Sequence, residues 1–286
     1  MPGYAYDPLA RLLGISRGYT ETHNYTPIGN FISKAGVTQY YSSTKPHAAT
    51  GLSNGATFTY DLNGNMTVRV EGGVTYTQTW DVDNQLIDVL SGTQHTQFFY
   101  DAGGGLVRKV DPRGTTAYIG ADDEITWLVP TQTITTTIPA TLTTYKLYLP
   151  VAAMNTLDAV NGVSTTYYSF NGARVAMRTG GSVYWLHGDH LGSASLTTNI
   201  SGTTLSELRY TPFGEVRLQN GNTPTDRTFT GQRVENAGSV GSLMNYGARF
   251  YSPILGRFIS ADSIIPQPGD PQNLNRFSYT LNNWWE

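Results

Sequence analysis

The sequence predicts an all-β protein, a curled antiparallel sheet of β-hairpins that forms a partial shell, and three observations support that prediction. Residues that favour strands and turns are abundant, with 19 Tyr and 31 Gly among 286 residues. Charged residues make up only 14% of the chain, below the share typical of soluble domains. An aromatic–acid pair also returns at even spacing, which is the pattern of a stacked repeat.

The repeat is clearest in the first half of the chain. The pairs are Tyr60-Asp61, Trp80-Asp81 and Tyr100-Asp101, and they begin 20 residues apart, with degenerate copies at Tyr6-Asp7, Tyr25-Thr26, Tyr168-Ser169 and Tyr210-Thr211. Each pair precedes a turn-rich tetrad and then an apolar strand. The acid can accept hydrogen bonds from the backbone two residues on, and Gly or Asn in the tetrad can adopt the positive φ of a turn. We therefore expect two strands and two turns in each unit.

Residues 66–70 illustrate the expected strand. Simple alternation places its three apolar residues on one face and Thr67 and Arg69 on the other. Gly72-Gly73 should form the second tight turn of the unit. Because one hairpin cannot bury its apolar face alone, successive hairpins should pair side by side into one long sheet.

Composition divides the chain into three expected parts. Residues 1–118 contain the regular hairpins, residues 119–166 are a Thr-rich connecting segment, and residues 167–286 form a C-terminal domain. In the connecting segment, 8 of the 14 residues from 131 to 144 are Thr, and their alternation with Ile favours further strands over a flexible linker. A short helix is best placed within residues 231–250, where the pattern is weak.

Charge and cysteine content exclude several function classes. The net charge is -3 without a basic run, so we expect neither nucleic acid nor an anionic membrane as a partner. The chain has no Cys and therefore no disulfides or thiol nucleophile. His187 to His190 includes two His and an Asp, but its Gly-containing turn suits hydrogen bonding better than zinc, and we expect no metal or cofactor. Neither a signal peptide nor a membrane-inserting stretch is expected in this chain.

Five motifs in the last 120 residues together resemble the Rhs repeat-associated core domain of the bacterial Rhs/YD-repeat family. They are Tyr168 to Arg178, Tyr184 to Ser195, Tyr210 to Glu215, Phe229 to Gln232 and Tyr246 to Phe258. With the repeats before them, the resemblance covers essentially the whole chain. The family includes insecticidal toxin-complex C subunits and polymorphic toxins, and the resemblance implies a secreted or cell-surface shell that encloses or presents a C-terminal toxin. Its partners would be that toxin polypeptide or a further shell chain. At roughly 14 units at most, this chain should form only part of a shell.

The resemblance also implies candidate catalytic residues, because aspartates in this family cleave the chain just after the core domain. Asp262 matches the family's aspartate, Asp270 is a weaker second candidate, and Arg257 could orient a carboxylate. The family's downstream Asn-Asn-Pro and Asp-Pro-x-Gly stretch is cut off, since the chain ends at Asn282 to Glu286. We therefore expect a C-terminal truncation, and we do not expect this chain to cleave itself.

Two other functions remain open at this stage. One is an autoproteolytic processing module that releases a downstream toxin. The other is a cell-surface adhesin that binds carbohydrate, with the repeated Tyr and Trp as a stacking platform for a cell-surface glycan. In strands, however, such residues more often pack against their cross-strand neighbours.

Overall fold

A computed structural model describes residues 3–16, 18–42, 44–128, 162–235, 240–265, 267 and 269–283. The first half of the large sheet consists of β1 (Tyr4–Tyr6), β2 (Leu12–Ile15), β3 (Glu21–Tyr25), β4 (Phe31–Lys34), β5 (Val37–Tyr41), β6 (Ala49–Leu52), β7 (Thr57–Tyr60), β8 (Met66–Glu71), β9 (Val74–Trp80) and β10 (Leu86–Ser91). The second half consists of β11 (Gln94–Tyr100), β12 (Leu106–Asp111), β13 (Gly114–Ile119), β14 (Asp123–Leu128), β15 (Val163–Phe170), β16 (Ala173–Thr179), β17 (Ser182–Gly188), β18 (Ala194–Asn199), β19 (Thr204–Tyr210) and β20 (Val216–Gly221).

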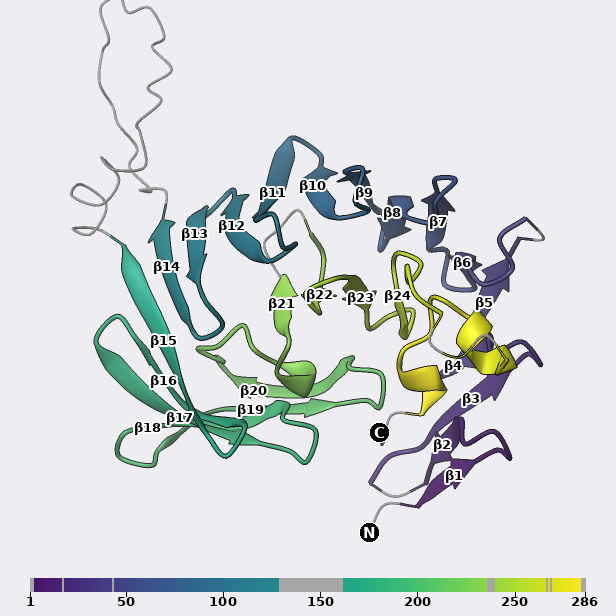
Figure 1. The fold of residues 1–286 in the computed structure, drawn as a ribbon. Coiled ribbons are helices and arrows are strands. Elements are labelled where there is room, and N and C mark those ends of the chain that lie inside the picture. Colours follow the sequence, from purple (N-terminus) through teal and green to yellow (C-terminus); the bar gives the residue numbers. More distant parts are fainter. Residues whose placement is uncertain are drawn as a thin grey trace, which may run out of the picture.

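These 20 strands form one continuous antiparallel sheet, so the prediction of an all-β curled sheet is confirmed. Each strand pairs with the next along the chain, from β1 with β2 through to β19 with β20. Figure 1 shows the sheet curling round into an open ring. We call this sheet the wall.

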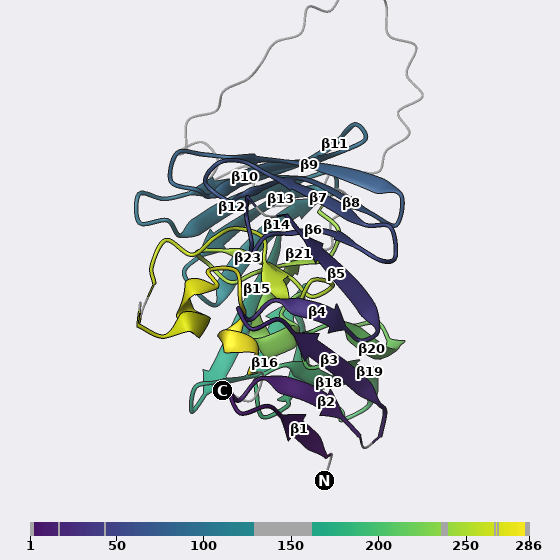
Figure 2. The ribbon, with the colours of Figure 1, turned by 90° about the vertical axis from the view of Figure 1, so that its right-hand side faces the viewer.

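The C-terminal part of the chain lies inside the ring (Figure 1), and we call the described residues between 229 and 283 the plug. Its elements are η2 (Phe229–Gly231), β21 (Arg233–Glu235), β22 (Leu243–Asn245), β23 (Phe250–Ser252), β24 (Arg257–Phe258), η3 (Pro271–Leu274) and η4 (Thr280–Asn282), where η marks a 3₁₀ turn. The four strands form their own antiparallel sheet. In Figure 2 the wall arches over this segment. The concave side of the wall is therefore occupied by the chain's own C-terminal part.

The aromatic–acid pairs open turns as the sequence predicted. The Oδ1 of Asp81 accepts hydrogen bonds from the backbone N–H of Asp83 at 3.0 Å and of Gln85 at 2.8 Å. Asp101 accepts from Gly103 and Gly105 in the same way, at 2.8 and 2.9 Å. The fourth loop position has positive φ in each unit, +92° at Gly64, +60° at Asn84 and +80° at Gly104. Equivalent loops follow Tyr6, Tyr25 and Tyr210.

The simple alternation expected for the strands is wrong, because a β-bulge follows each aromatic. Tyr60 pairs with Met66 and Thr59 pairs with Val68, so Thr67 is the extra residue and the inward positions become Met66 and Arg69. Arg69 is fully buried, and β10 repeats the pattern with Leu86 and Val89. In each of these strands, the bulge therefore makes the residue three positions after the first inward residue point toward the plug as well.

Three other expectations differ from the structure or fall outside it. The pair Tyr168-Ser169 does not open a five-residue loop, because Phe170 pairs with Ala173 across a two-residue turn with positive φ at both positions. The helix expected within 231–250 is absent from the described residues of that range, where β21, β22 and the start of β23 pair instead. The residues 131–144 and 284–286 lie outside the described residues.

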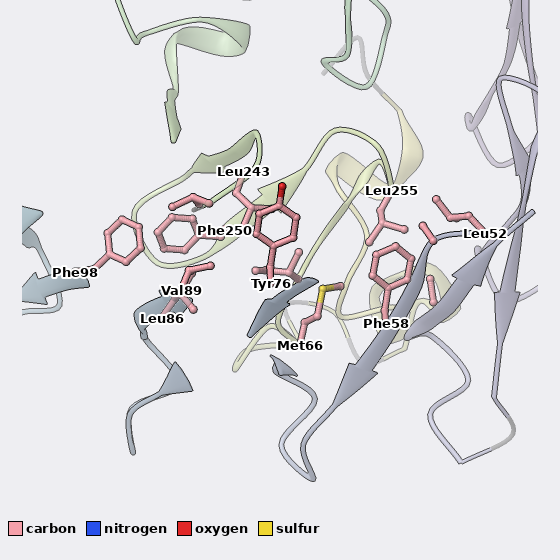
Figure 3. Packing of buried hydrophobic residues seen from close by; sticks show 14 residues of the cluster. Leu52, Phe58, Met66, Tyr76, Leu86, Val89, Phe98, Leu243, Phe250 and Leu255 are labelled. Carbon is pink, nitrogen blue, oxygen red and sulfur yellow. The ribbon is translucent and has the colours of Figure 1, made fainter. Parts of the chain in front are cut away.

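The main apolar core lies between the wall and the plug. Phe58, Met66, Tyr76, Leu86, Val89 and Phe98 from the wall surround Leu243, Phe250, Leu255 and Ile259 from the plug. Figure 3 shows the labelled side chains converging, and the rings of Phe98 and Phe250 lie 5.1 Å apart. Burying such side chains stabilises a fold by roughly 1.5–3 kcal/mol each. Within the described ranges, no helix is both long and apolar enough to cross a membrane.

The repeated aromatics tie each hairpin to the one before it. Each ring turns inward, and its polar hydrogen is donated to the carbonyl that opens an earlier strand, over 2.7 to 2.9 Å: Tyr25 to Leu12, Tyr60 to Ala49, Trp80 to Met66, Tyr100 to Leu86 and Tyr210 to Ala194. A buried Tyr or Trp needs such a partner. These aromatics therefore pack within the wall rather than present a platform for sugars.

Candidate functional site

Asp262, the first candidate for catalysis, forms an ion pair just after β24. Its Oδ2 lies 2.7 Å from Nη2 of Arg249, and its Oδ1 accepts the backbone N–H of Ile264 at 3.0 Å. Arg249 also donates to the backbone carbonyl of Arg276 at 3.1 Å, and its guanidinium lies 3.7 Å from the ring centre of Phe258. Burial lowers the pKa of Arg249, and the carboxylate of Asp262 opposes that shift. Asp262 is thus a fixed carboxylate whose side chain is 33% exposed.

Asp270, the second candidate, caps a short helical turn. Its Oδ1 accepts the backbone N–H of Gln272 at 2.9 Å, and its Oδ2 accepts the side-chain amide of Asn273 at 2.9 Å. The first of these bonds satisfies a free backbone N–H group at the start of η3. Among the described contacts, none joins Asp270 to Asp262. The side chain of Asp270 therefore acts as a local cap of this turn.

Arg257, the third candidate, points into the interior toward the N-terminal strands. It is 1% exposed, and its guanidinium donates to the carbonyl of His47 and, at 3.1 Å, to Oδ1 of Asn30. The same guanidinium lies 5.2 Å from the ring centre of Tyr41. The described contacts bring Arg257 to these groups and not to either aspartate.

The arginine beside Asp262 was missed by the sequence argument. Arg249 lies within the motif Tyr246 to Phe258, so the motif contained the signal. Its pairing with Asp262 depends on the hairpin that joins β23 to β24, which spacing alone does not reveal.

Asp189 makes the turn hydrogen bonds that were expected for the segment His187 to His190. Its Oδ1 accepts the backbone N–H of Leu191 and Ser193, both at 2.9 Å.

Buried ion pairs join the wall to the plug on one side of the ring. Nζ of Lys109 lies 2.8 Å from Oε2 of Glu235, and Glu235 is fully buried. Arg233 bridges two carboxylates, that of Glu124 at 2.7 Å and that of Asp226 at 2.9 Å. Burial and the nearby Asp226 raise the pKa of Glu124, and Arg233 opposes them. This region contrasts with the apolar core around Phe98.

The loop after β19 closes the ring through side chains. Phe213 is fully buried, and its ring lies 5.1 Å from the rings of both His23 and Phe31. Glu215 forms an ion pair with the buried Lys34 of β4. The backbone carbonyl of Phe213 accepts the hydroxyl of Tyr251 in the plug at 2.9 Å. We call this contact the clasp, residues 211–217 with β3 and β4.

His23 is a buried titratable group within the clasp. It is 1% exposed, and both ring nitrogens lack a hydrogen-bond partner within the described part of the chain. Nε2 lies 3.3 Å from Oε1 of Glu21 but does not meet hydrogen-bond geometry. Burial and the cationic Lys34 lower the pKa of His23 to about 4. The imidazole is therefore neutral at neutral pH.

The space left between wall and plug is small. A cavity of about 560 Å³ lies between β12, the β19–β20 hairpin and the plug, lined among others by Lys109, Asp226, Met244 and Ile254. That volume suits a small molecule and is far too small for a protein domain. This cavity alone could not hold a protein cargo.

Two curated proteins are similar to this chain in sequence. The chain is 25% identical over 237 residues to a tRNA3(Ser)-specific nuclease WapA of Bacillus spizizenii and 24% identical over 237 residues to a tRNA nuclease WapA of Bacillus subtilis. Each match covers 80% of this chain and 9% of the relative. No family model matches the chain.

Solved structures show a similar fold. The chain aligns with the crystal structure of TcdB2-TccC3 at a TM-score of 0.56 and 16% identity, which covers 99% of this chain and 17% of that one. It aligns with a variant of the Photorhabdus luminescens Tc holotoxin pore at a TM-score of 0.56 and 15% identity, covering 99% of this chain and 16% of that one. At these identities the likeness shows the fold, and this chain spans under a fifth of either structure.

Proposed function

We propose that this chain is the C-terminal wall of an Rhs-type toxin shell, secreted or at the cell surface, and that it acts as a scaffold for a toxin polypeptide. The observation that carries the proposal is the curled 20-stranded sheet, together with the alignment of 99% of the chain with TcdB2-TccC3. The filled concave face favours presenting the toxin over enclosing it alone. The nuclease activity in the relatives' names is not carried over, because this chain matches 9% of their length.

The test is to express the whole coding sequence that contains this chain and to treat the purified product with protease. A scaffold role predicts that a bound polypeptide co-purifies and is cut only when the wall unfolds. Arg69→Met should advance that cleavage, because Arg69 donates to the plug carbonyls of Val240 and Gly241. Tyr40→Phe, at an exposed site, is the matched control. A product without bound polypeptide, or one cut equally fast in the folded and unfolded states, contradicts the proposal.

A second candidate function is self-cleavage of the parent protein at the end of the core domain. The pairing of Asp262 with Arg249 favours it, because a fixed carboxylate beside a cation can take part in acid–base chemistry on a peptide bond. Asp270 and Arg257 stay proposed partners in this reaction. The test restores a downstream Asn-Asn-Pro and Asp-Pro-x-Gly tail and looks for a shortened product. That product should vanish in Asp262→Asn, and its persistence there would exclude the role of Asp262.

A further inference from the structure

Three aromatic side chains gather on the outward face of β15 and β17. Tyr168, Ala176 and Trp185 are register partners in one row across β15, β16 and β17, so their side chains share a face of the sheet. The opposite face points into the ring, because the neighbouring Tyr167 is buried and donates its hydroxyl to Asp226, just before the plug, at 3.1 Å. In Figure 1 these strands form the part of the ring most distant from β1 to β5.

The rings of this row are uncovered. Tyr168 is 45% exposed, Trp185 is 43% exposed and Phe170, two residues along β15, is 76% exposed. Ala176 lies between them in the row and is only 4% exposed, so a small side chain separates the two aromatic side chains. Elsewhere on the wall, Phe99 is covered by the guanidinium of Arg108, 3.8 Å from the ring centre. In the described ranges, no cation or second ring covers Tyr168, Phe170 or Trp185.

An arginine without an ion-pair partner among the described residues stands beside the row. Arg178 is exposed and stands in the next row of the same face, opposite Thr166 and Val183. No carboxylate pairs with it among the described residues. The nearest acid by register, Asp123, is exposed and stands in the row of Arg178, two strands away beyond Thr166, and among the described residues no ion pair joins the two. An apolar protein segment laid here would bury an unpaired guanidinium, which is costly, whereas an anionic ligand would pair with it.

We propose that the outward face of β15–β17 binds an acidic glycan. One sugar ring stacks against Tyr168 and Trp185, and a carboxylate of the glycan pairs with Arg178. Hydroxyl and imidazole groups border the site, since Nε2 of His187 lies 3.2 Å from Oγ1 of Thr198 in the same region. Aromatic faces suit the C–H face of a sugar, and the arginine fork suits a carboxylate. This surface is independent of the scaffold role.

The experiment measures binding of the purified chain to two matched pairs of probes, oligogalacturonate against its methyl ester, and sialyllactose against lactose. We expect saturable binding to at least one acidic probe and weaker binding to its neutral partner. Trp185→Ala should weaken binding at least about tenfold, and Arg178→Met should abolish the preference for the acidic probe. Tyr40→Ala, an exposed aromatic outside the site, should leave binding unchanged.

Three outcomes overturn the proposal. They are no saturable binding to either acidic probe, equal binding to acidic and neutral probes, and binding that survives Trp185→Ala. All substituted side chains are exposed, so unfolding is not expected to confuse the result, and an unchanged thermal transition for each variant checks this directly.

Discussion

Val89 and Lys109 occupy the same position in successive repeat units, yet the wall holds the plug differently around each. Val89 is fully buried in the apolar core with Phe98 and Phe250. Lys109, 20 residues on, is buried against the carboxylate of Glu235. The bulge after each aromatic turns both side chains inward. The repeat therefore fixes where the side chain points, and the residue type decides whether the plug is held by apolar contact or by charge.

The two contacts should respond differently to substitution. Apolar packing loses free energy in proportion to the atoms removed, because its cost is set by buried area and cavity volume. A buried ion pair loses more when one partner is removed than it contributes when intact, since the remaining charge stays desolvated. We therefore infer that the charged side of the ring fixes the position of the plug more than it adds stability.

The largest expected effect is for Lys109→Met. Burial alone would lower the pKa of Lys109, but the carboxylate of Glu235 raises it above its usual value, so the amine is protonated at neutral pH. Removing the amine leaves a fully buried carboxylate, and the free energy of unfolding should fall by about 3–5 kcal/mol. Urea denaturation followed by tryptophan fluorescence measures it. The double variant Lys109→Met with Glu235→Leu should recover most of the loss, and a double variant no better than the single one contradicts the argument.

Local features were predictable from sequence, and the plug was not. The turn made by Asp81 and Asn84 follows from residues within five positions of one another, so local chemistry determines it. The contact of Arg69 with Val240 joins residues 171 positions apart, and no periodicity encodes it. For the same reason the motif identified Asp262 but not its partner Arg249, and the inward direction of Arg257 depends on His47, 210 positions away.

The next largest effect is a fall in the free energy of unfolding at acid pH. It concerns the clasp, where the buried group can change its charge. His23 lies in an apolar contact, and burial and Lys34 lower its pKa from 6.5 to about 4. The unfolded chain therefore binds a proton that the folded chain resists, so stability is full above about pH 6.5 and falls as the pH drops toward about 4. The loss should reach up to about 3 kcal/mol.

Two carboxylates near His23 bear on this pH response. Glu21 beside His23 has a pKa raised by burial, so its own protonation favours the folded state as the pH falls and partly offsets the loss. Glu215 is held by Lys34 at the same contact. In His23→Gln the fall between pH 6.5 and 4 should be smaller than in the unmodified chain, as measured by the urea midpoint at each pH. An identical fall in both chains would remove His23 as the cause.

A smaller effect is expected for Val89→Ala, the counterpart of Lys109→Met in the apolar region. Two buried methyl groups are lost from a fully buried side chain, which should cost about 2 kcal/mol. No charge is left unpaired, so added salt should change the difference little. Urea denaturation at low and high salt measures both statements. A loss equal to that of Lys109→Met would show that residue type at this position does not set how the plug is held.

The smallest effect should be the same in both regions, because it concerns two aspartates whose described side-chain hydrogen bonds stay within their own loops. Asp81→Ala removes two hydrogen bonds to the backbone in the unit of the apolar contact, and Asp101→Ala removes two in the unit of the ion pair. Each substitution should cost about 1 kcal/mol, and the corresponding Asn variants should cost less because the amide oxygen still accepts. Thermal unfolding of the four variants measures the differences. If Asp101→Ala costs several times more than Asp81→Ala, the rim loops do not act independently of the plug, and the division between turn and plug contact would have to be redrawn.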